Sequence, residues 1–428
     1  MTMKTAFTRR QRRIFLGCFL AYFSAYMVRL NLPAALNSMM SALALSGAQC
    51  GLLQTVFALV YACGQFVNGA IVDRVSARRH ILLGLGFSGL FNLLFGFAAK
   101  YWMLVVLWAL NGAAQSMIWT PVVKLIAVWF KGRRRGRASF GITMTLIAGN
   151  LCAWLLSGAV ASAVSWRWSF VLPAAWAILA AGLSRWILAD RPEPGEDLGE
   201  EEADRKRAFT GKAMPFRTTL FTTGLAPLLV CCVGNGFVRD GIITWAPTII
   251  ARLHRAGAPA PVLTPLAIPL LNLVGVLLAR RVYAAFNGNA RRCTGALMLL
   301  CAALAFLLIP LGRRIVPCVL LLGLCCSATN GINPMLTTFI PMEYERVGRV
   351  GLVAGMVDAF IYLGSSLAGI VTGAVSDAAG WWPVFALWGA AALAACAAGL
   401  TSVRGVRQLD GWRRDPRKPD AAPKIQEG

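Results

Sequence analysis

Charged residues and histidine are scarce in this chain. Only 14% of its 428 residues are charged, 18 are acidic, and two are histidines, His80 and His254. So few histidines, with no cysteine–histidine spacing typical of a metal site, argue against a zinc centre and against histidine-based catalysis. Neither a nucleophile–base pair nor a phosphate-binding loop is found. The sequence therefore predicts no enzyme, no bound cofactor and no metal.

Long apolar segments are abundant instead. Hydrophobic residues make up 57% of the chain, and its mean hydropathy of +0.63 lies outside the range of soluble globular proteins. About twelve segments are long enough to cross a hydrocarbon core, which needs roughly 20 helical residues. They lie near 14–36, 47–71, 80–99, 102–129, 138–161, 168–189, 220–251, 262–285, 293–311, 315–341, 350–375 and 381–403. We expect an all-α polytopic membrane protein with twelve transmembrane helices.

Basic residues outnumber acidic ones, and the net charge is +24. If the N-terminus is cytoplasmic, most of them fall in the two tails and in alternate loops, which is the positive-inside pattern. The clusters comprise Arg9, Arg10, Arg12 and Arg13; Arg74, Arg78 and Arg79; Lys131, Arg133, Arg134, Arg135 and Arg137; Arg280, Arg281, Arg291 and Arg292; and Arg404, Arg407, Arg413, Arg414, Arg417 and Lys418. Arg252, Arg255, Arg313 and Arg314 are exceptions on the opposite face. The pattern predicts cytoplasmic termini and makes nucleic acid a poor second explanation of the charge.

A polar segment at 190–218 divides the chain into two related halves. Segments 157–170 and 372–385 align without gaps and share Gly158/Gly373 and Trp166/Trp381. Parallel six-helix repeats are typical of secondary carriers whose solute site lies between the halves. The expected domains are a tail at 1–13, a six-helix bundle at 14–189, a cytoplasmic linker at 190–218, a second bundle at 219–403 and a basic tail at 404–428.

Two arginines lie deep within apolar segments, at matching places in the two halves. Arg29 falls in the segment 14–36 and Arg239 in the segment 225–250. An arginine at the centre of a membrane helix costs at least about 2.5–3.5 kcal/mol, and it stays protonated. Each arginine could reach an interface or pair internally, but their repetition favours a site for an anion. A guanidinium can bond two oxygens of phosphate, carboxylate or sulfonate at once.

The segment 69–79, GAIVDRVSARR, resembles the loop motif G-x-x-x-D-R-x-x-x-R-R of the major facilitator superfamily. The residues that carry the resemblance are Gly69, Asp73, Arg74, Arg78 and Arg79. Asp73 at a helix end could pair with an arginine of a neighbouring helix and latch the cytoplasmic side. The alternative is a turn within a basic loop. The counterpart near Ala279, Arg280 and Arg281 lacks the acid, so any latch is expected on one side only.

Four segments then resemble the organophosphate–phosphate antiporters, the branch that contains the glycerol-3-phosphate and hexose-phosphate exchangers. They are YMVRLNLPAA at 26–35, NGAAQSMIWTPVVKLIAVWF at 111–130, VRDGIITWAPT at 238–248 and GLVAGMVDAFIYLGS at 351–365. The resemblance implies that Arg29 and Arg239 bind phosphate, and it places further solute-binding residues at Tyr22, Tyr26, Tyr362, Lys124 and Asn330. The tyrosines could equally be packing aromatics, and Lys124 could extend toward the cytoplasmic end.

The sequence also departs from that branch. Leu146 and Gln65 replace a histidine and a lysine, and a tyrosine is missing near Asn330. Asp240 and Asp358 are additional carboxylates, which often mark proton coupling within membranes. Alternatively, Asp358 balances Arg239 as a structural pair, and Asp240, being adjacent to Arg239 in the helix, faces away.

Three functions follow from this pattern. The first is a bacterial inner-membrane exchanger of organophosphate for phosphate, expected as a monomer, whose partners are a small anionic solute and the lipid bilayer. The second is a proton-coupled symporter of an organic anion such as a carboxylate. The third is a membrane sensor of the same fold that does not transport, although the short linker and tail do not suggest a docking element for a partner.

Overall fold

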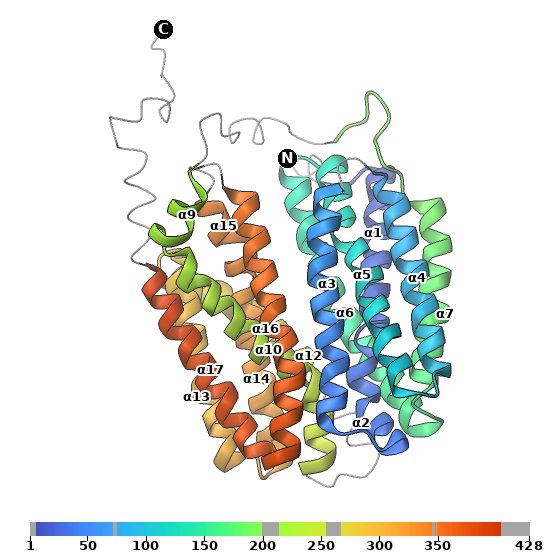
Figure 1. Cartoon of the computed structure of the whole chain (residues 1–428). Coiled ribbons are helices and arrows are strands. Elements are labelled where there is room, and N and C mark those ends of the chain that lie inside the picture. The colour runs from blue at the N-terminus through green and yellow to red at the C-terminus, as the bar shows by residue number, and fades with distance from the viewer. Residues whose placement is uncertain are drawn as a thin grey trace.

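The computed structural model describes residues 6–71, 75–198, 214–253, 267–344, 347 and 349–403. Within these ranges the chain is helical and contains no strand. Figure 1 shows the helices of the first half and those of the second half as two groups that lie side by side. The two-bundle, all-α architecture predicted from the apolar segments is confirmed.

The first half begins with α1 (Arg9–Met27) and α2 (Asn31–Leu43). These are followed by α3 (Gly47–Ile71), α4 (Ala77–Phe97), α5 (Tyr101–Trp129), α6 (Gly132–Ala163) and α7 (Trp168–Ile187). The second half contains α9 (Phe216–Thr222), α10 (Leu225–Leu253), α12 (Ala267–Ala285), α13 (Ala290–Leu311), α14 (Ile315–Pro334), the π-helix η3 (Met335–Phe339), α15 (Ile340–Glu343), α16 (Val350–Ala379) and α17 (Trp381–Ser402).

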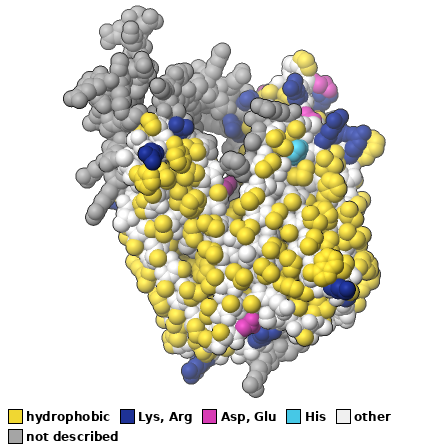
Figure 2. All heavy atoms as spheres, viewed as in Figure 1, with side chains coloured by type: hydrophobic (Ala, Val, Ile, Leu, Met, Phe, Trp, Pro, Cys, Tyr) yellow, Lys and Arg dark blue, Asp and Glu magenta, His cyan; other side chains and the backbone are white. Residues whose placement is uncertain are grey.

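Among the described residues, ten helical stretches are long and apolar enough to cross a membrane. The helices α1 and α2 form one of these stretches, and α14, η3 and α15 form another. Adding α6 and α12, of 32 and 19 residues, gives the expected twelve crossings. Hydrophobic side chains cover the middle of the face in Figure 2, whereas the described Lys and Arg side chains lie toward its ends. Large apolar side chains such as Trp186, 76% exposed, are therefore suited to lipid.

The first crossing is not the continuous helix expected over 14–36. The helix α1 ends at Met27 and α2 begins at Asn31, so Arg29 lies in the turn between them. A broken helix leaves carbonyl groups without their usual partners. Three buried amides donate to the Val28 carbonyl, from Asn92, Asn111 and Gln115 at 3.1, 3.0 and 3.2 Å. These amides of α4 and α5 stabilise the break and thereby fix the position of Arg29.

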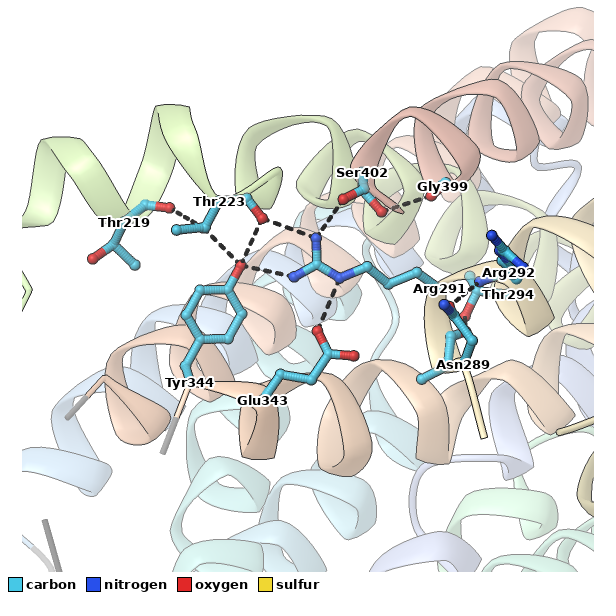
Figure 3. A network of polar contacts seen from close by, with 11 residues as sticks. Thr219, Thr223, Asn289, Arg291, Arg292, Thr294, Glu343, Tyr344, Gly399 and Ser402 are labelled. Carbon is cyan, nitrogen blue, oxygen red and sulfur yellow. Dashed lines mark hydrogen bonds and ion pairs between the residues drawn. The ribbon is translucent and has the colours of Figure 1, made fainter. Parts of the chain in front are cut away.

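A buried arginine organises one end of the second half (Figure 3). The guanidinium of Arg291, at the start of α13, donates to the carbonyls of Thr223 and Ser402 at 2.9 and 2.6 Å. It also donates to the Tyr344 hydroxyl and to the Glu343 carboxylate, each at 3.0 Å. The expectation that Arg291 is one more basic loop residue is wrong, because its side chain is 0% exposed. It holds the ends of α9, α13, α15 and α17 together.

Replacing this arginine should destabilise the fold. We expect Arg291→Met to lower the free energy of unfolding by about 3 kcal/mol, because it removes the buried donor of the Thr223 and Ser402 carbonyls and of the Tyr344 hydroxyl. Thermal unfolding of the purified protein in detergent measures the change. Arg292→Met is the matched control, since Arg292 is adjacent in sequence but exposed. Equal unfolding temperatures of the two variants would contradict the anchoring role.

Candidate functional site

The two halves meet where α3 packs against α16. Glycines of one helix face glycines of the other, so the backbones come into close contact: a Cβ built on Gly51 would lie 2.6 Å from the carbonyl carbon of Gly369. The side chain of Thr55 accepts a hydrogen bond from the Ile370 backbone at 3.2 Å and donates to the Ser366 carbonyl at 2.5 Å. Small residues that permit such an approach are typical of tight helix contacts in membranes.

A carboxylate of the second half caps a helix of the first. The backbone N–H groups of Gly47 and Ala48, the first residues of α3, donate to the carboxylate of Asp377 at 2.9 and 2.8 Å. A negative charge at a helix N-terminus satisfies unpaired N–H groups and interacts favourably with the helix dipole. The hydrogen bonds from Thr55 to the Ser366 carbonyl, from the Ile370 backbone to Thr55, and from Arg252 to the sulfur of Met40 also join the halves at this end of the molecule. The halves are therefore closed at the end formed by the start of α3 and the end of α16.

Arg29 lies at the inner edge of this contact, surrounded by aromatic rings. Its guanidinium carbon is 5.1, 5.0 and 5.8 Å from the ring centres of Phe57, Tyr61 and Tyr362. The first two rings belong to α3 and the third to α16, so side chains of both halves contact one arginine. Among the described residues its guanidinium makes no hydrogen bond and no ion pair. The ring faces stabilise the cation and leave its N–H groups available to an anion.

Arg239, on α10, is paired. Its Nε and Nη2 donate to the two carboxylate oxygens of Asp240 at 2.8 and 3.1 Å, and its Nη1 donates to Asn333 of α14 at 3.3 Å. Both charged side chains are nearly buried, 13% and 10% exposed. The expectation that Asp240 could face away from Arg239 is therefore wrong, whereas Asp358 makes no ion pair with Arg239 among the described residues. The two arginines nevertheless interact electrostatically across the contact between the halves.

The predicted tyrosines gather around the arginines. Tyr22 and Tyr26 lie on one face of α1, with ring centres 5.1 Å apart and hydroxyls at 3.5 Å. Tyr22 also stacks on Trp119 at 4.6 Å. Across the contact, the rings of Tyr61 and Tyr362 are 4.7 Å apart. The structure thus brings Tyr22, Tyr26 and Tyr362 to one region with Arg29, although it does not test whether they bind a solute.

Phe57 and Tyr61 of this region were not identified from the sequence, and Gln65 was named there only as a departure from the resembled branch. Phe57 and Tyr61 follow one another by one helical turn on α3, but an aromatic pair of that spacing is common in any helix core. Gln65 extends the same face, since its amide donates to the Tyr61 hydroxyl at 2.6 Å and accepts from Thr120 at 2.9 Å. Gln65 therefore orients a tyrosine that contacts Arg29.

Lys124 and Asn330 do not join the arginines. The Lys124 ammonium donates to the Val75 carbonyl at 3.1 Å, which places it near the start of α4. The Asn330 amide donates to the carbonyl and the sulfur of Cys326, within its own helix, at 2.9 and 3.3 Å. Asn333, three residues further along, is the amide that reaches Arg239. The predicted roles of Lys124 and Asn330 in binding the solute have no geometric support.

Asp358 is exposed on α16, one helical turn before Tyr362. Its carboxylate makes no hydrogen bond or ion pair with the part of the chain that the structure describes. It interacts electrostatically with Arg239 and with Cys232 of α10. Asp358 is therefore an unpaired carboxylate close to the paired arginine.

The loop motif is only partly visible. Gly69 belongs to the last turns of α3, whereas Asp73 and Arg74 lie outside the described residues. The backbone of Arg78 donates to Asp190 at 2.9 Å, and that of Arg79 donates to the N-cap Ser76 at 3.1 Å. The predicted latch through Asp73 stays a prediction.

Comparison with known proteins agrees with this architecture. A sequence model of the family described as Major Facilitator Superfamily matches residues 14–351. The glycerol-3-phosphate transporter of Bacillus subtilis is 24% identical over 398 residues, covering 89% of both chains. The membrane sensor protein UhpC of Escherichia coli is 27% identical over 393 residues, covering 87% of both. The glucose-6-phosphate exchanger SLC37A2 of Danio rerio is 25% identical over 403 residues, covering 85% of this chain and 80% of that protein.

Solved structures share the fold. A bacterial homologue of the human lysosomal transporter Spinster, in an inward-facing and unoccupied conformation, aligns with a TM-score of 0.71 at 17% identity. The alignment covers 94% of this chain and 97% of that one. The nucleoside transporter NupG aligns with a TM-score of 0.67 at 13% identity over 91% and 99% of the two chains. At these identities the likeness concerns the fold alone.

Proposed function

The chain belongs to the major facilitator superfamily, and we propose that it exchanges an organophosphate for inorganic phosphate across a membrane by alternating access. The observation that carries the proposal is the environment of Arg29. Its guanidinium is held among rings of both halves and makes no hydrogen bond or ion pair within the described ranges. Three relatives whose names refer to glycerol phosphate, glucose phosphate and hexose phosphate support phosphate esters as the solute class.

The proposed cycle depends on the two arginines unequally. Phosphate oxygens would bind the donors of Arg29 directly, with bidentate geometry. Arg239 is already bonded to Asp240, so the anion would share that guanidinium with the carboxylate or displace it. Because Arg29 comes from the first half and Arg239 from the second, an anion between them would draw the halves together around the site. The empty carrier would keep the unneutralised Arg29, which disfavours return without a solute.

The orientation and surroundings form part of the proposal. The positive-inside pattern supports cytoplasmic termini in a bacterial inner membrane. In that orientation the closed end, at the start of α3 and the end of α16, is periplasmic, and the conformation is inward-facing. We propose a monomer that needs no cofactor, performs no catalysis and binds no nucleic acid.

Uptake of labelled phosphate into liposomes that contain the purified protein tests the proposal. We expect strong uptake into vesicles loaded with phosphate and at least about tenfold less into empty vesicles, since the exchange step requires an anion on both sides. Glycerol-3-phosphate and glucose-6-phosphate inside the vesicles should also support uptake. Equal uptake into loaded and empty vesicles would indicate a uniporter or symporter instead of an exchanger.

A sensor that does not transport is the second candidate, because one relative of similar coverage, 27% identical, carries that name. The two functions predict different results with the same sample. A sensor should be stabilised against heat by an organophosphate, yet should move no phosphate into loaded vesicles. Uptake in loaded vesicles therefore excludes a sensor that does not transport.

A further inference from the structure

An unpaired carboxylate near the binding site of an anion carrier would repel the solute, and Asp358 is such a carboxylate. The side chain is exposed, and within the described ranges it has no hydrogen-bond or ion-pair partner. A charge in a membrane protein is costly unless it is paired or hydrated. Asp358 must therefore face water or a ligand for part of the transport cycle.

The exposed face of Asp358 is not the lipid-facing one. The apolar side chains of Leu363, Leu367 and Ile370 are 41%, 42% and 36% exposed and follow one stripe of α16. At 100° per residue, Asp358 lies roughly 140° away from that stripe and only about 40° from Tyr362. Gly355 lies on the same face, and a Cβ built there would meet no atom within 4 Å. Asp358 therefore opens into free space between the halves, on the side of Tyr362 that is away from the closed end.

The charges of the site fit a solute of mixed charge better than a simple anion. Arg239 is neutralised by Asp240, whereas Arg29 and Asp358 have no ion-pair partner in the part of the chain that the structure describes. A phosphate ester without another charge would bring two negative charges toward Asp358 and be repelled by it. A solute that also carries a cation would satisfy both free charges at once.

Resting on the proposed exchange of organophosphates, we propose that the organic solute carries an amino group and that Asp358 binds this ammonium while Arg29 binds the phosphate. Tyr362 contacts Arg29, and Asp358 precedes Tyr362 by four residues, which is about 6 Å along the helix. The ammonium and the phosphorus should therefore be separated by a comparable distance. This geometry suits an aminoalkyl phosphate or an amino-sugar phosphate. Asp358 would then determine which esters the carrier accepts.

Paired esters that differ only in the amino group test the inference. Glucosamine-6-phosphate is compared with glucose-6-phosphate, and 2-aminoethyl phosphate with ethyl phosphate. Apparent affinities come from the rise of the unfolding temperature with ester concentration and, separately, from inhibition of phosphate exchange. In the wild type we expect the amino ester of each pair to bind about tenfold more tightly, which corresponds to about 1.4 kcal/mol. In Asp358→Asn the ratio should fall to about one.

Asp377→Asn is the matched control, because it removes a carboxylate from the same helix at the closed end, and it should keep the wild-type ratio. Equal binding of the paired esters by the wild type, or a preference that persists in Asp358→Asn, overturns the inference even where phosphate exchange is found. A second result would also overturn the inference: the wild type binds both esters of a pair equally, its phosphate exchange depends on pH, and Asp358→Asn abolishes that dependence for both esters. Asp358 would then bind a proton instead of an ammonium. Preferential binding of amino esters without any phosphate exchange overturns only the proposed exchange.

Discussion

Arg29→Lys is expected to reduce phosphate exchange by about a hundredfold. The guanidinium presents planar, paired donors to an anion, whereas an ammonium presents a single point charge on a flexible stem. A hydrogen bond to a charged group contributes about 1.5–3 kcal/mol, and the loss of one or two of them lowers binding of the anion accordingly. The lysine ammonium would also leave the faces of Phe57, Tyr61 and Tyr362 incompletely covered, because these rings now surround a larger cation.

Exchange is measured with labelled phosphate in loaded vesicles, after size-exclusion chromatography has shown that the variant is folded. Arg313→Lys provides the control, since Arg313 is an exposed arginine far along the chain from the site, and it should retain wild-type exchange. If Arg29→Lys also retains it, the solute does not depend on the guanidinium fork, and the proposed phosphate site is wrong.

The overall architecture was predictable because it follows from composition and length. Runs of about 20 apolar residues can bury their backbone only as helices in a membrane, and polar turns separate the runs wherever the chain reverses. The two membrane arginines were predictable for a related reason: their cost is so high that chance placement in both halves is improbable. Tyr22 and Tyr26 were named because the resemblance to the organophosphate–phosphate antiporters places tyrosines one and two turns before Arg29.

The sequence did not predict the turn at Arg29 or the burial of Arg291, because both features depend on residues that are distant along the chain. The turn at Arg29 contains neither proline nor glycine, and its stabilising amides, Asn92 and Asn111, lie more than sixty residues away. Arg291 resembled a loop cation because its partners, Glu343 and Tyr344, come from another helix. In each case a polar group is buried by elements that a single segment of sequence does not contain.

The pairing of Arg239 with Asp240 shows a limit of helical periodicity. Adjacent residues point about 100° apart, which suggested different faces. The Arg239 side chain is long enough to reach across that angle. Two of its nitrogens therefore donate to the carboxylate of the short Asp240 side chain. Helical periodicity also failed to distinguish Asn330, the predicted site residue, from Asn333, the residue that contacts Arg239. A π-helix begins at Met335, immediately after them, and Asn333 is the amide that reaches Arg239.

The closed end of the molecule is a second place where one substitution should have a large effect. In the present conformation the start of α3 and the end of α16 approach each other through Gly47, Gly51, Gly369 and Gly373. The neighbouring Cys50 is fully buried there and interacts electrostatically with Asp377 and Arg252 of the second half. Opening this end exposes Cys50, so its reactivity reports the conformation.

Gly51→Leu is expected to prevent this end from closing, because the new side chain would occupy the position of the Gly369 backbone, which cannot rotate away as a side chain can. Overpacking at such a contact costs about 1–3 kcal/mol or more, so the population of the closed form should fall by roughly a hundredfold. Exchange needs both conformations and should decrease by a similar factor, while labelling of Cys50 by a membrane-impermeant thiol reagent, followed by mass spectrometry, should increase. Gly182→Leu is the control, since a Cβ at Gly182 of α7 meets no atom within 4 Å. Unchanged labelling and exchange in Gly51→Leu would mean that the contact of α3 with α16 does not close the carrier.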